Sequence, residues 1–161
     1  MKLKKIYINK YIKRGVCILF FMSTVYTVSL ADSLTDVKQS IISQSRALGV
    51  EPAIMLSIAK AESGFNQSAI GSGGTVGVFQ LHTDTAKKMG CNPYIMEENV
   101  KCGILYYKKL YEMFNSTQLA VAAYNAGPEG IKRANYKVPL YSQKFVSKIM
   151  SDYDFYKKQS F

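Results

Sequence analysis

Two polar side chains stand at the ends of a loop rich in glycine and serine. Glu62 directly follows the nearly all-apolar segment 52–61, and Gln80 lies inside the apolar run 78–81. An ordinary loop between helices has no need of an acid at its entrance and an amide at its exit. A carbohydrate-binding cleft needs both, because a carboxylic acid protonates a glycosidic oxygen while amides hold sugar hydroxyls.

The helical position of Glu62 predicts an acid that keeps its proton near neutral pH. At about 100° per residue, Glu62 continues the apolar stripe of Ile54 and Ile58, whereas Ser57 and Lys60 mark the solvent side. A carboxyl on the core side loses solvation, which raises its pKa as a general acid for glycosidic cleavage requires. The alternative is that Glu62 follows the helix end and lies in water. Periodicity alone leaves both interpretations open.

The number of carboxyl groups in this stretch bears on the mechanism. Glycosidases usually use two, one as the acid and one as the nucleophile or base. Within residues 62–86 the other acid is Asp84, near the far end. If Glu62 works alone, the second role has to come from the substrate. His82 is the one histidine of the chain, and without a second histidine or an acidic cluster we interpret it as a lining or surface residue. We therefore expect no metal site and no cofactor.

Residues 62–86 resemble the catalytic motif of the soluble lytic transglycosylase family. That motif runs Glu-Ser, an aromatic residue, Asn, a small-residue loop, Gly, an apolar pair, Gln and later Thr-Ala. The positions that match it are Glu62, Ser63, Phe65, Asn66, Ala69, Gly74, Gly77, Gln80, Leu81, Thr85 and Ala86. A second family signature, Ala-Tyr-Asn-Ala-Gly, appears at residues 123–127. The resemblance extends from about residue 41 to residue 146.

The resemblance implies a mainly α, goose-type lysozyme-like domain with a sugar-binding cleft. It assigns Glu62 as the catalytic acid and places Tyr124 beside it. The residues it implies for sugar binding are Ser63, Ser72, Phe79, Gln80, Tyr124 and Asn125. Each has a simpler alternative: the glycine-rich loop is a flexible surface turn, Tyr124 is a core residue, and Asn125 belongs to a helix C-terminus.

Several positions depart from the family pattern. Gly71 stands where the family has a sugar-binding serine, and Ser72 is the candidate substitute. Thr75 replaces the usual alanine, and Phe79 replaces the usual methionine. Thr83-Asp84 replaces the proline before Thr-Ala, and Tyr141-Ser142 stands where an acidic residue is common. These departures affect the details of sugar binding rather than the acid.

By resemblance, the reaction is cleavage of the β-1,4 bond between N-acetylmuramic acid and N-acetylglucosamine in peptidoglycan. Glu62 serves as acid and then as base, and a 1,6-anhydro ring closes without water. Two alternatives remain. One is a lysozyme-type hydrolase in which Asp84 positions water, and the other is a non-catalytic peptidoglycan-binding assembly protein. Small exported domains of this kind resemble those that open the wall for type III or type IV secretion or conjugation machines.

The N-terminal segment predicts export. Residues 1–15 carry six basic residues and no acid, residues 16–30 are apolar, and a small-residue site precedes Asp32. This is the pattern of a secretory signal peptide over 1–31, followed by a catalytic domain over 32–161 in the periplasm. An uncleaved membrane anchor is the alternative. Without residues 1–31 the net charge falls from +10 to +4, which suits an anionic wall polymer. We expect a monomer and no nucleic-acid partner.

Four helices and a disulfide are predicted as scaffold. The helices cover 33–48, 97–114, 116–126 and 141–158, each with apolar residues on one face. Gly103 is expected to permit close packing of the second of these. Cys91 and Cys102 are the cysteines left after the signal segment, and an even pair in an exported protein suggests a disulfide. Two separate buried thiols are the alternative.

Overall fold

The computed structural model describes residues 34–159 of the chain. The predicted signal peptide over 1–31 lies outside these residues. The chain divides into a unit of residues 1–36, of which residues 34–36 are helical, and a unit that begins at Val37. The second unit is described below. Within residues 34–159, none of the helices combines the length and apolar character that crossing a bilayer would need.

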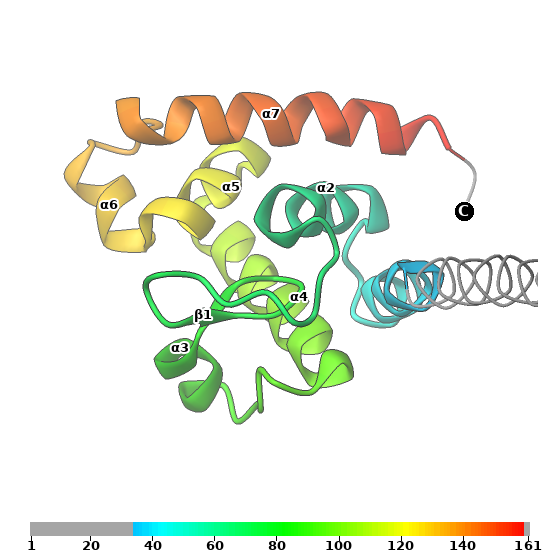
Figure 1. Cartoon of the computed structure of the whole chain (residues 1–161). Coiled ribbons are helices and arrows are strands. Elements are labelled where there is room, and N and C mark those ends of the chain that lie inside the picture. The colour runs from blue at the N-terminus through cyan, green and yellow to red at the C-terminus, as the bar shows by residue number, and fades with distance from the viewer. Residues whose placement is uncertain (1–33, 160–161) are drawn as a thin grey trace, which may run out of the picture. The chain divides into compact units, whose positions relative to one another are not determined.

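Helices make up most of the second unit, and one small hairpin interrupts them (Figure 1). Residues 37–47 are helical. The later elements are α2 (Pro52–Ser63), β1 (Thr75–Val76), β2 (Leu81–His82), α3 (Thr83–Lys88), α4 (Met96–Phe114), α5 (Thr117–Ala126), α6 (Pro128–Arg133) and α7 (Leu140–Lys157). The predicted helices over 97–114, 116–126 and 141–158 are therefore confirmed within one residue at each end, and the one over 33–48 is confirmed over its described part, residues 34–47. The short helices α3 and α6 and the hairpin are additional.

The core lies where α2, α4, α5 and α7 meet. In Figure 1, α7 runs along one side and α2 and α5 lie beneath it. The main helix contacts are those of α2 with α7 and of α5 with α4, α6 and α7. The largest fully buried side chains are Phe79, Ile41, Met55, Leu56, Ile58, Leu81, Ile104, Leu110, Ile131 and Ile149. Small residues of α5, Ala120, Ala122 and Ala123, are completely buried and let its neighbours approach closely.

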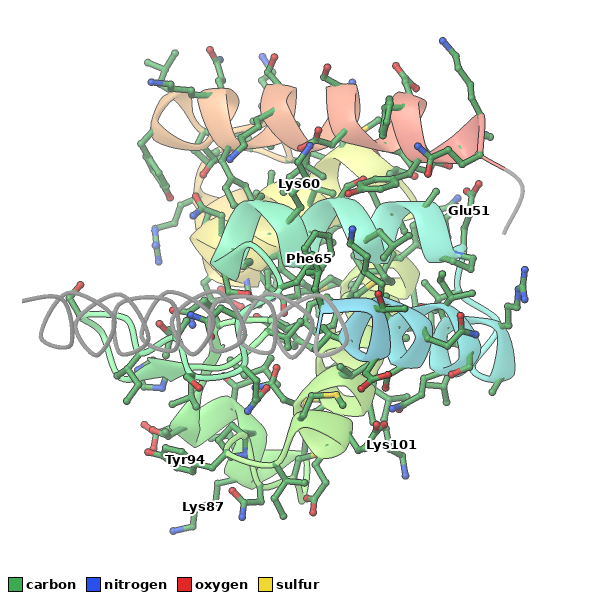
Figure 2. All side chains as sticks on the ribbon, turned by 45° about the vertical axis from the view of Figure 1, so that its right-hand side comes forward. Glu51, Lys60, Phe65, Lys87, Tyr94 and Lys101 are labelled. Carbon is green, nitrogen blue, oxygen red and sulfur yellow. A yellow bond between two sulfur atoms is a disulfide. The ribbon has the colours of Figure 1, made fainter. Side chains whose placement is uncertain are left out.

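One face of α2 differs from the sequence prediction. Lys60 is exposed and reaches α7, where its Nζ lies 2.6 Å from Oδ1 of Asp152 (Figure 2). Ser57, however, is fully buried, and its hydroxyl donates to the carbonyl of Ala53 at 2.7 Å. The assignment of Ser57 to the solvent side was therefore wrong. A buried helical serine satisfies its hydroxyl on the preceding turn, so its polarity does not mark exposure.

The hairpin that carries Gln80 is anchored by Asn99 of α4. The strands are antiparallel, with Thr75 opposite His82 and Val76 opposite Leu81. The side chain of Asn99 is fully buried; it accepts from the amide of Phe79 at 2.9 Å and donates to the carbonyl of Val76 at 2.8 Å. These bonds satisfy backbone groups that the short strands leave unpaired.

Two glycines allow the hairpin and α4 to approach each other. A Cβ on Gly77, whose φ is +80°, would lie 2.3 Å from Nδ2 of Asn99. A Cβ on Gly103 would lie 2.4 Å from the ring of Phe79. Both contacts are too short for any side chain, so both positions require glycine. The prediction of close packing at Gly103 is confirmed.

A disulfide joins the segment after α3 to α4. Cys91 and Cys102 are bridged, with their Cα atoms 6.5 Å apart. Cys102 is completely buried in the core beside the anchored hairpin. The bridge thus links the segment after α3 to the same helix that carries Asn99.

Candidate active site

Glu62 lies in the last turn of α2, one residue before the helix ends at Ser63. Gly64 follows in the left-handed conformation, with φ +63°, and turns the chain into the loop. The Glu62 side chain is partly buried, and burial raises its pKa from 4.5 to about 7. The prediction that this carboxyl loses solvation is confirmed, and the alternative of a fully solvated glutamate is excluded.

Tyr124 of α5 lies within electrostatic reach of Glu62. Its hydroxyl donates to the backbone carbonyl of Phe79 at 3.0 Å, and its ring packs edge-to-face on Tyr106 with centroids 5.2 Å apart. Burial raises the pKa of Tyr124 well above 10, and the charge of Glu62 raises it further. The structure therefore brings together the acid from α2, the tyrosine from α5 and the hairpin. Tyr124 stays neutral and serves as a hydrogen-bond donor.

Ser63 holds the start of the loop rather than facing outward. Its hydroxyl donates to the carbonyl of Val78 at 2.8 Å and accepts from the amide of Asn66 at 3.0 Å. Both ends of the loop are therefore attached to the C-terminal end of α2. This arrangement fixes the hairpin next to Glu62 and leaves Ser63 a positioning role.

Gln80 has an unusual backbone conformation and a fully engaged amide group. Its φ is +43°, outside the range that most side chains adopt. Its Nε2 donates to the carbonyls of Ala69 at 3.1 Å and Gly77 at 3.0 Å. Its Oε1 accepts from the hydroxyl of Thr75 at 2.9 Å. Both amide hydrogens are used inside the loop, so the side chain can offer a sugar only an acceptor lone pair.

Thr75 is a site residue that the sequence analysis missed. A Cβ on Gly71 would lie 2.2 Å from Oγ1 of Thr75, so the threonine hydroxyl occupies the space that a side chain at position 71 would take. The hydroxyl donates to Gln80 and keeps its lone pairs for another donor. The signal in the sequence was the pair of departures, Gly71 for serine and Thr75 for alanine, which are complementary in space.

A hollow of about 370 Å³ lies beside Tyr124. Its walls come from the hairpin, the start of α3 and the α4 and α5 helices. The lining residues are Thr75, Gln80, Leu81, His82, Thr85, Tyr106, Tyr124, Asn125, Ala126 and Gly127. Four of them carry hydroxyl groups and two carry amide groups, which matches the alternating donors and acceptors of a sugar.

Asn125 and His82 have defined partners at this hollow. Ser142 is fully buried, and its hydroxyl donates to Oδ1 of Asn125 at 2.9 Å, which orients the amide. His82 is exposed, and its Nδ1 accepts from the amide of Asp84 at the start of α3. His82 is therefore a lining residue with a capping role. No group of three or more His, Cys, Asp or Glu side chains within residues 34–159 is arranged to hold a metal ion.

Three predicted sugar-binding residues do not line the hollow: Ser63, whose hydroxyl is engaged in the loop, Phe79 and Ser72. The ring of Phe79 is completely buried against Gly103, so its side chain cannot reach a ligand and the prediction was wrong. The aromatic ring fills the core because the apolar pair at 78–79 is the part of the hairpin that faces α4. Ser72 is exposed at the loop tip, and no contact within the described residues directs its hydroxyl toward Tyr124 or Gln80.

No second carboxylate acts on Glu62 among the described residues. Burial is the cause of its raised pKa, with no charged neighbour contributing. The side chain of Asp84 is 78% exposed and lies near His82, with Oδ2 of Asp84 4.0 Å from Nδ1 of His82. A carboxylate beside Glu62 would have raised its pKa through repulsion.

A helical domain with a partly buried acid at the end of one helix, and a sugar-sized hollow lined by the tyrosine that feels its charge, defines a lysozyme-like class of protein. The family model of the transglycosylase SLT domain matches residues 39–144. The chain belongs to this family.

Solved structures with the same fold support this assignment. An inactive mutant of lytic transglycosylase Slt from Pseudomonas aeruginosa matches with a TM-score of 0.66 and 22% identity. The 70 kDa soluble lytic transglycosylase from Escherichia coli matches with a TM-score of 0.65 and 21% identity. Each match covers 74% of this chain and 24% of the other. The chain therefore spans about a quarter of the length of these proteins, and the likeness confirms the predicted mainly α, lysozyme-like fold.

Proposed function

We propose that this protein is a peptidoglycan lytic transglycosylase that cleaves the β-1,4 bond between N-acetylmuramic acid and N-acetylglucosamine. The observation that carries the proposal is Glu62. Burial alone raises its pKa to about 7, and no second carboxylate of the described residues acts on it. A single protonated acid suits a reaction in which the substrate supplies the nucleophile.

The proposed reaction begins with proton transfer from Glu62 to the glycosidic oxygen. The C1–O bond of the muramic residue breaks as its own N-acetyl oxygen bonds to C1. The carboxylate of Glu62 then takes the proton of the C6 hydroxyl, and the C6 oxygen attacks C1 and displaces the N-acetyl oxygen. Glu62 regains its proton, no water is consumed, and the product carries a 1,6-anhydro ring. A pKa near 7 suits a group that is acid and then base.

The surrounding residues would hold the sugar and the acid in place. Tyr124 and Ser63 attach the hairpin beside Glu62 through the carbonyls of Phe79 and Val78. The free lone pairs of Thr75 and the oriented amide of Asn125 would contact sugar hydroxyl or N-acetyl groups in the hollow. The substrate-binding set that we propose is therefore Thr75, Gln80, Tyr124 and Asn125.

A lysozyme-type hydrolase is the second candidate, and a non-catalytic wall-binding protein is the third. A hydrolase needs a group that positions water, and the exposed Asp84 is the acid that the sequence offers near the site. A binding protein needs no protonated acid, so the raised pKa of Glu62 favours catalysis over binding alone. We further propose that the chain is exported to the periplasm, acts as a monomer and opens the wall locally for a secretion or conjugation machine.

The deciding experiment compares the products that the protein and Glu62→Gln release from purified peptidoglycan. Mass spectrometry should find muropeptides one water lighter than reducing-end muropeptides, and the variant should release at least about a hundredfold less. Glu129→Gln is the matched control, because Glu129 is an exposed acid paired with Lys132 on α6. Reducing ends would indicate a hydrolase. No release, with the wall still bound, would indicate a binding protein.

A further inference from the structure

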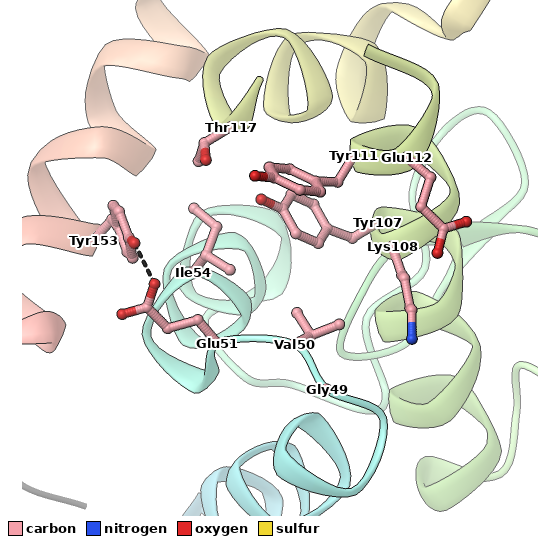
Figure 3. A pocket seen from close by; sticks show the side chains of 10 residues that line it. All are labelled: Gly49, Val50, Glu51, Ile54, Tyr107, Lys108, Tyr111, Glu112, Thr117 and Tyr153. Carbon is pink, nitrogen blue, oxygen red and sulfur yellow. Dashed lines mark hydrogen bonds between the residues drawn. The ribbon is translucent and has the colours of Figure 1, made fainter. Parts of the chain in front are cut away.

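A second hollow lies at the end of α2 opposite Glu62 (Figure 3). It measures about 460 Å³ and shares no lining residue with the hollow beside Tyr124. Glu51, which directly precedes α2, lines it. At a rise of about 1.5 Å per residue, the 11 positions between Glu51 and Glu62 place the two sites roughly 16 Å apart along the helix. A molecule bound here would leave the glycan site free.

Three tyrosines line this hollow. Tyr107 and Tyr111 lie one turn apart on α4, with ring centroids 6.4 Å apart and an angle of 31° between the rings. Tyr153 of α7 faces them across Ile54, as Figure 3 shows. Tyr111 is 42% exposed and Tyr107 is 4% exposed, so the pair extends from the surface into the interior. Ring faces carry negative π density, which attracts cations.

The carboxylate of Glu51 adds a full negative charge to these rings. The hydroxyl of Tyr153 donates to Oε2 of Glu51, which leaves the other carboxylate oxygen for a ligand. Burial is the main cause that raises the pKa of Tyr107 to about 12; a side-chain hydrogen bond with Thr117 lowers this pKa, and Tyr111 and Glu51 raise it by less. Glu51 and the neutral hydroxyl of Tyr107 thus line the same hollow.

Bases as well as acids lie at this hollow, and the Nζ of Lys157 is 5.3 Å from the ring centroid of Tyr153. Glu112 is a second acid, and Lys108 is the one base of the lining. The Nζ of Lys108 donates to the carbonyl of Leu48 at 2.9 Å, which holds it at the edge near Gly49. The lining itself therefore carries two acids and one base, in a chain whose net charge is +10.

We propose that this hollow binds a lysine side chain of a partner polypeptide. The ammonium group would contact the free oxygen of Glu51, and the alkyl chain would lie along Tyr107 and Tyr111. An ammonium is favoured over a guanidinium because one oxygen of Glu51 is already bonded to Tyr153, which prevents the two-point contact that arginine prefers. The proposal stands independently of the proposed function, since its site is separate from the acid.

Titration of the whole protein, labelled with ¹³C in its tyrosine rings, tests the proposal. The probe is acetyl-Gly-Lys-Gly-amide, and its neutral match is the same peptide with norleucine. The lysine peptide should shift the ring signals of Tyr107, Tyr111 and Tyr153, which single substitutions to phenylalanine assign. The norleucine peptide should bind at least about fivefold more weakly than the lysine peptide. Glu62→Gln should bind the probe unchanged.

Two variants test separately how the Glu51 carboxylate and the tyrosine rings contribute to binding of the lysine peptide. Glu51→Gln should weaken lysine binding about fivefold or more, whereas Glu129→Gln, an equal change of charge on α6, should leave it unchanged. Tyr111→Leu keeps Glu51 and removes an exposed ring, and it should also weaken binding. Equal binding of the norleucine peptide, or undiminished binding by Glu51→Gln, would overturn the proposal. If a disaccharide tetrapeptide shifts the same ring signals and binds more tightly than the lysine peptide, the ligand of this hollow is a wall peptide and the proposed polypeptide partner is overturned.

Discussion

The hydroxyl of Tyr124 donates a 3.0 Å hydrogen bond to the backbone carbonyl of Phe79. This bond joins α5 to the hairpin at the residue before Gln80. Because Tyr124 also feels the charge of Glu62 and lines the hollow, one side chain links the acid, the hairpin and the hollow. Tyr124 thus holds the hairpin in position relative to Glu62.

Tyr124→Phe should reduce activity more than it reduces stability. Loss of the hydroxyl leaves the Phe79 carbonyl without its donor, which should lower the free energy of unfolding by about 1–2 kcal/mol. Because the hairpin is then free to shift relative to Glu62, kcat should fall roughly tenfold to a hundredfold with KM less affected. Tyr106→Phe is the control, since it removes a hydroxyl from the same hollow and retains the ring contact. Equal losses in both variants would contradict the assigned role.

Activity should decline on the alkaline side with a midpoint near pH 7. The proposed reaction starts from protonated Glu62, whose pKa burial raises to about 7. The rate of muropeptide release should therefore fall about tenfold per pH unit above that value. Initial rates between pH 5 and 9 at constant ionic strength measure this dependence. A decline centred near pH 4.5 would mean that Glu62 is solvated in the working enzyme.

Glu62→Gln should make the protein more stable at pH 8 than the parent. Between pH 4.5 and 7 the unfolded chain ionises Glu62 while the folded chain keeps the proton, so the folded state binds more protons and stability falls as pH rises. The full difference is at most about 3 kcal/mol, and it is absent below pH 4.5. Urea unfolding followed by circular dichroism at pH 4 and pH 8 checks this. A parent and variant with the same pH dependence would argue against the burial of Glu62.

Gly71→Ser should destabilise the protein, and Thr75→Ala should rescue it. A Cβ at position 71 would lie 2.2 Å from Oγ1 of Thr75 and 2.7 Å from Oε1 of Gln80, so the single change should cost about 1–3 kcal/mol. The double variant removes the clashing hydroxyl and should recover most of this loss, which gives a coupling of about 1 kcal/mol or more. Gly73→Ser is the control, because no atom lies within 4 Å of its Cβ position. Additive effects of the two changes would show that the residues do not share this space.

Local patterns in the sequence were sufficient for the long helices and for the family. The stripe of Ile54 and Ile58 put Glu62 on their helix face, because residues at i, i+4 and i+8 lie together whatever surrounds the helix, but it left the buried and the solvated acid both open. The motifs around Glu62 and Tyr124 likewise indicated the family, whose model matches residues 39–144. Such features depend on neighbours in sequence, so the sequence determined them by itself.

Long-range packing decided the remaining features of the site. Phe79 was predicted to face the sugar and Ser57 to face solvent, yet both are buried by helices distant in sequence. The complementarity of Thr75 and Gly71 and the tyrosine-lined hollow near Glu51 likewise appear only when the loop and the helices are in place. The physical reason is that periodicity fixes the direction of a side chain on its own element. What fills the space in front of that side chain depends on tertiary structure alone.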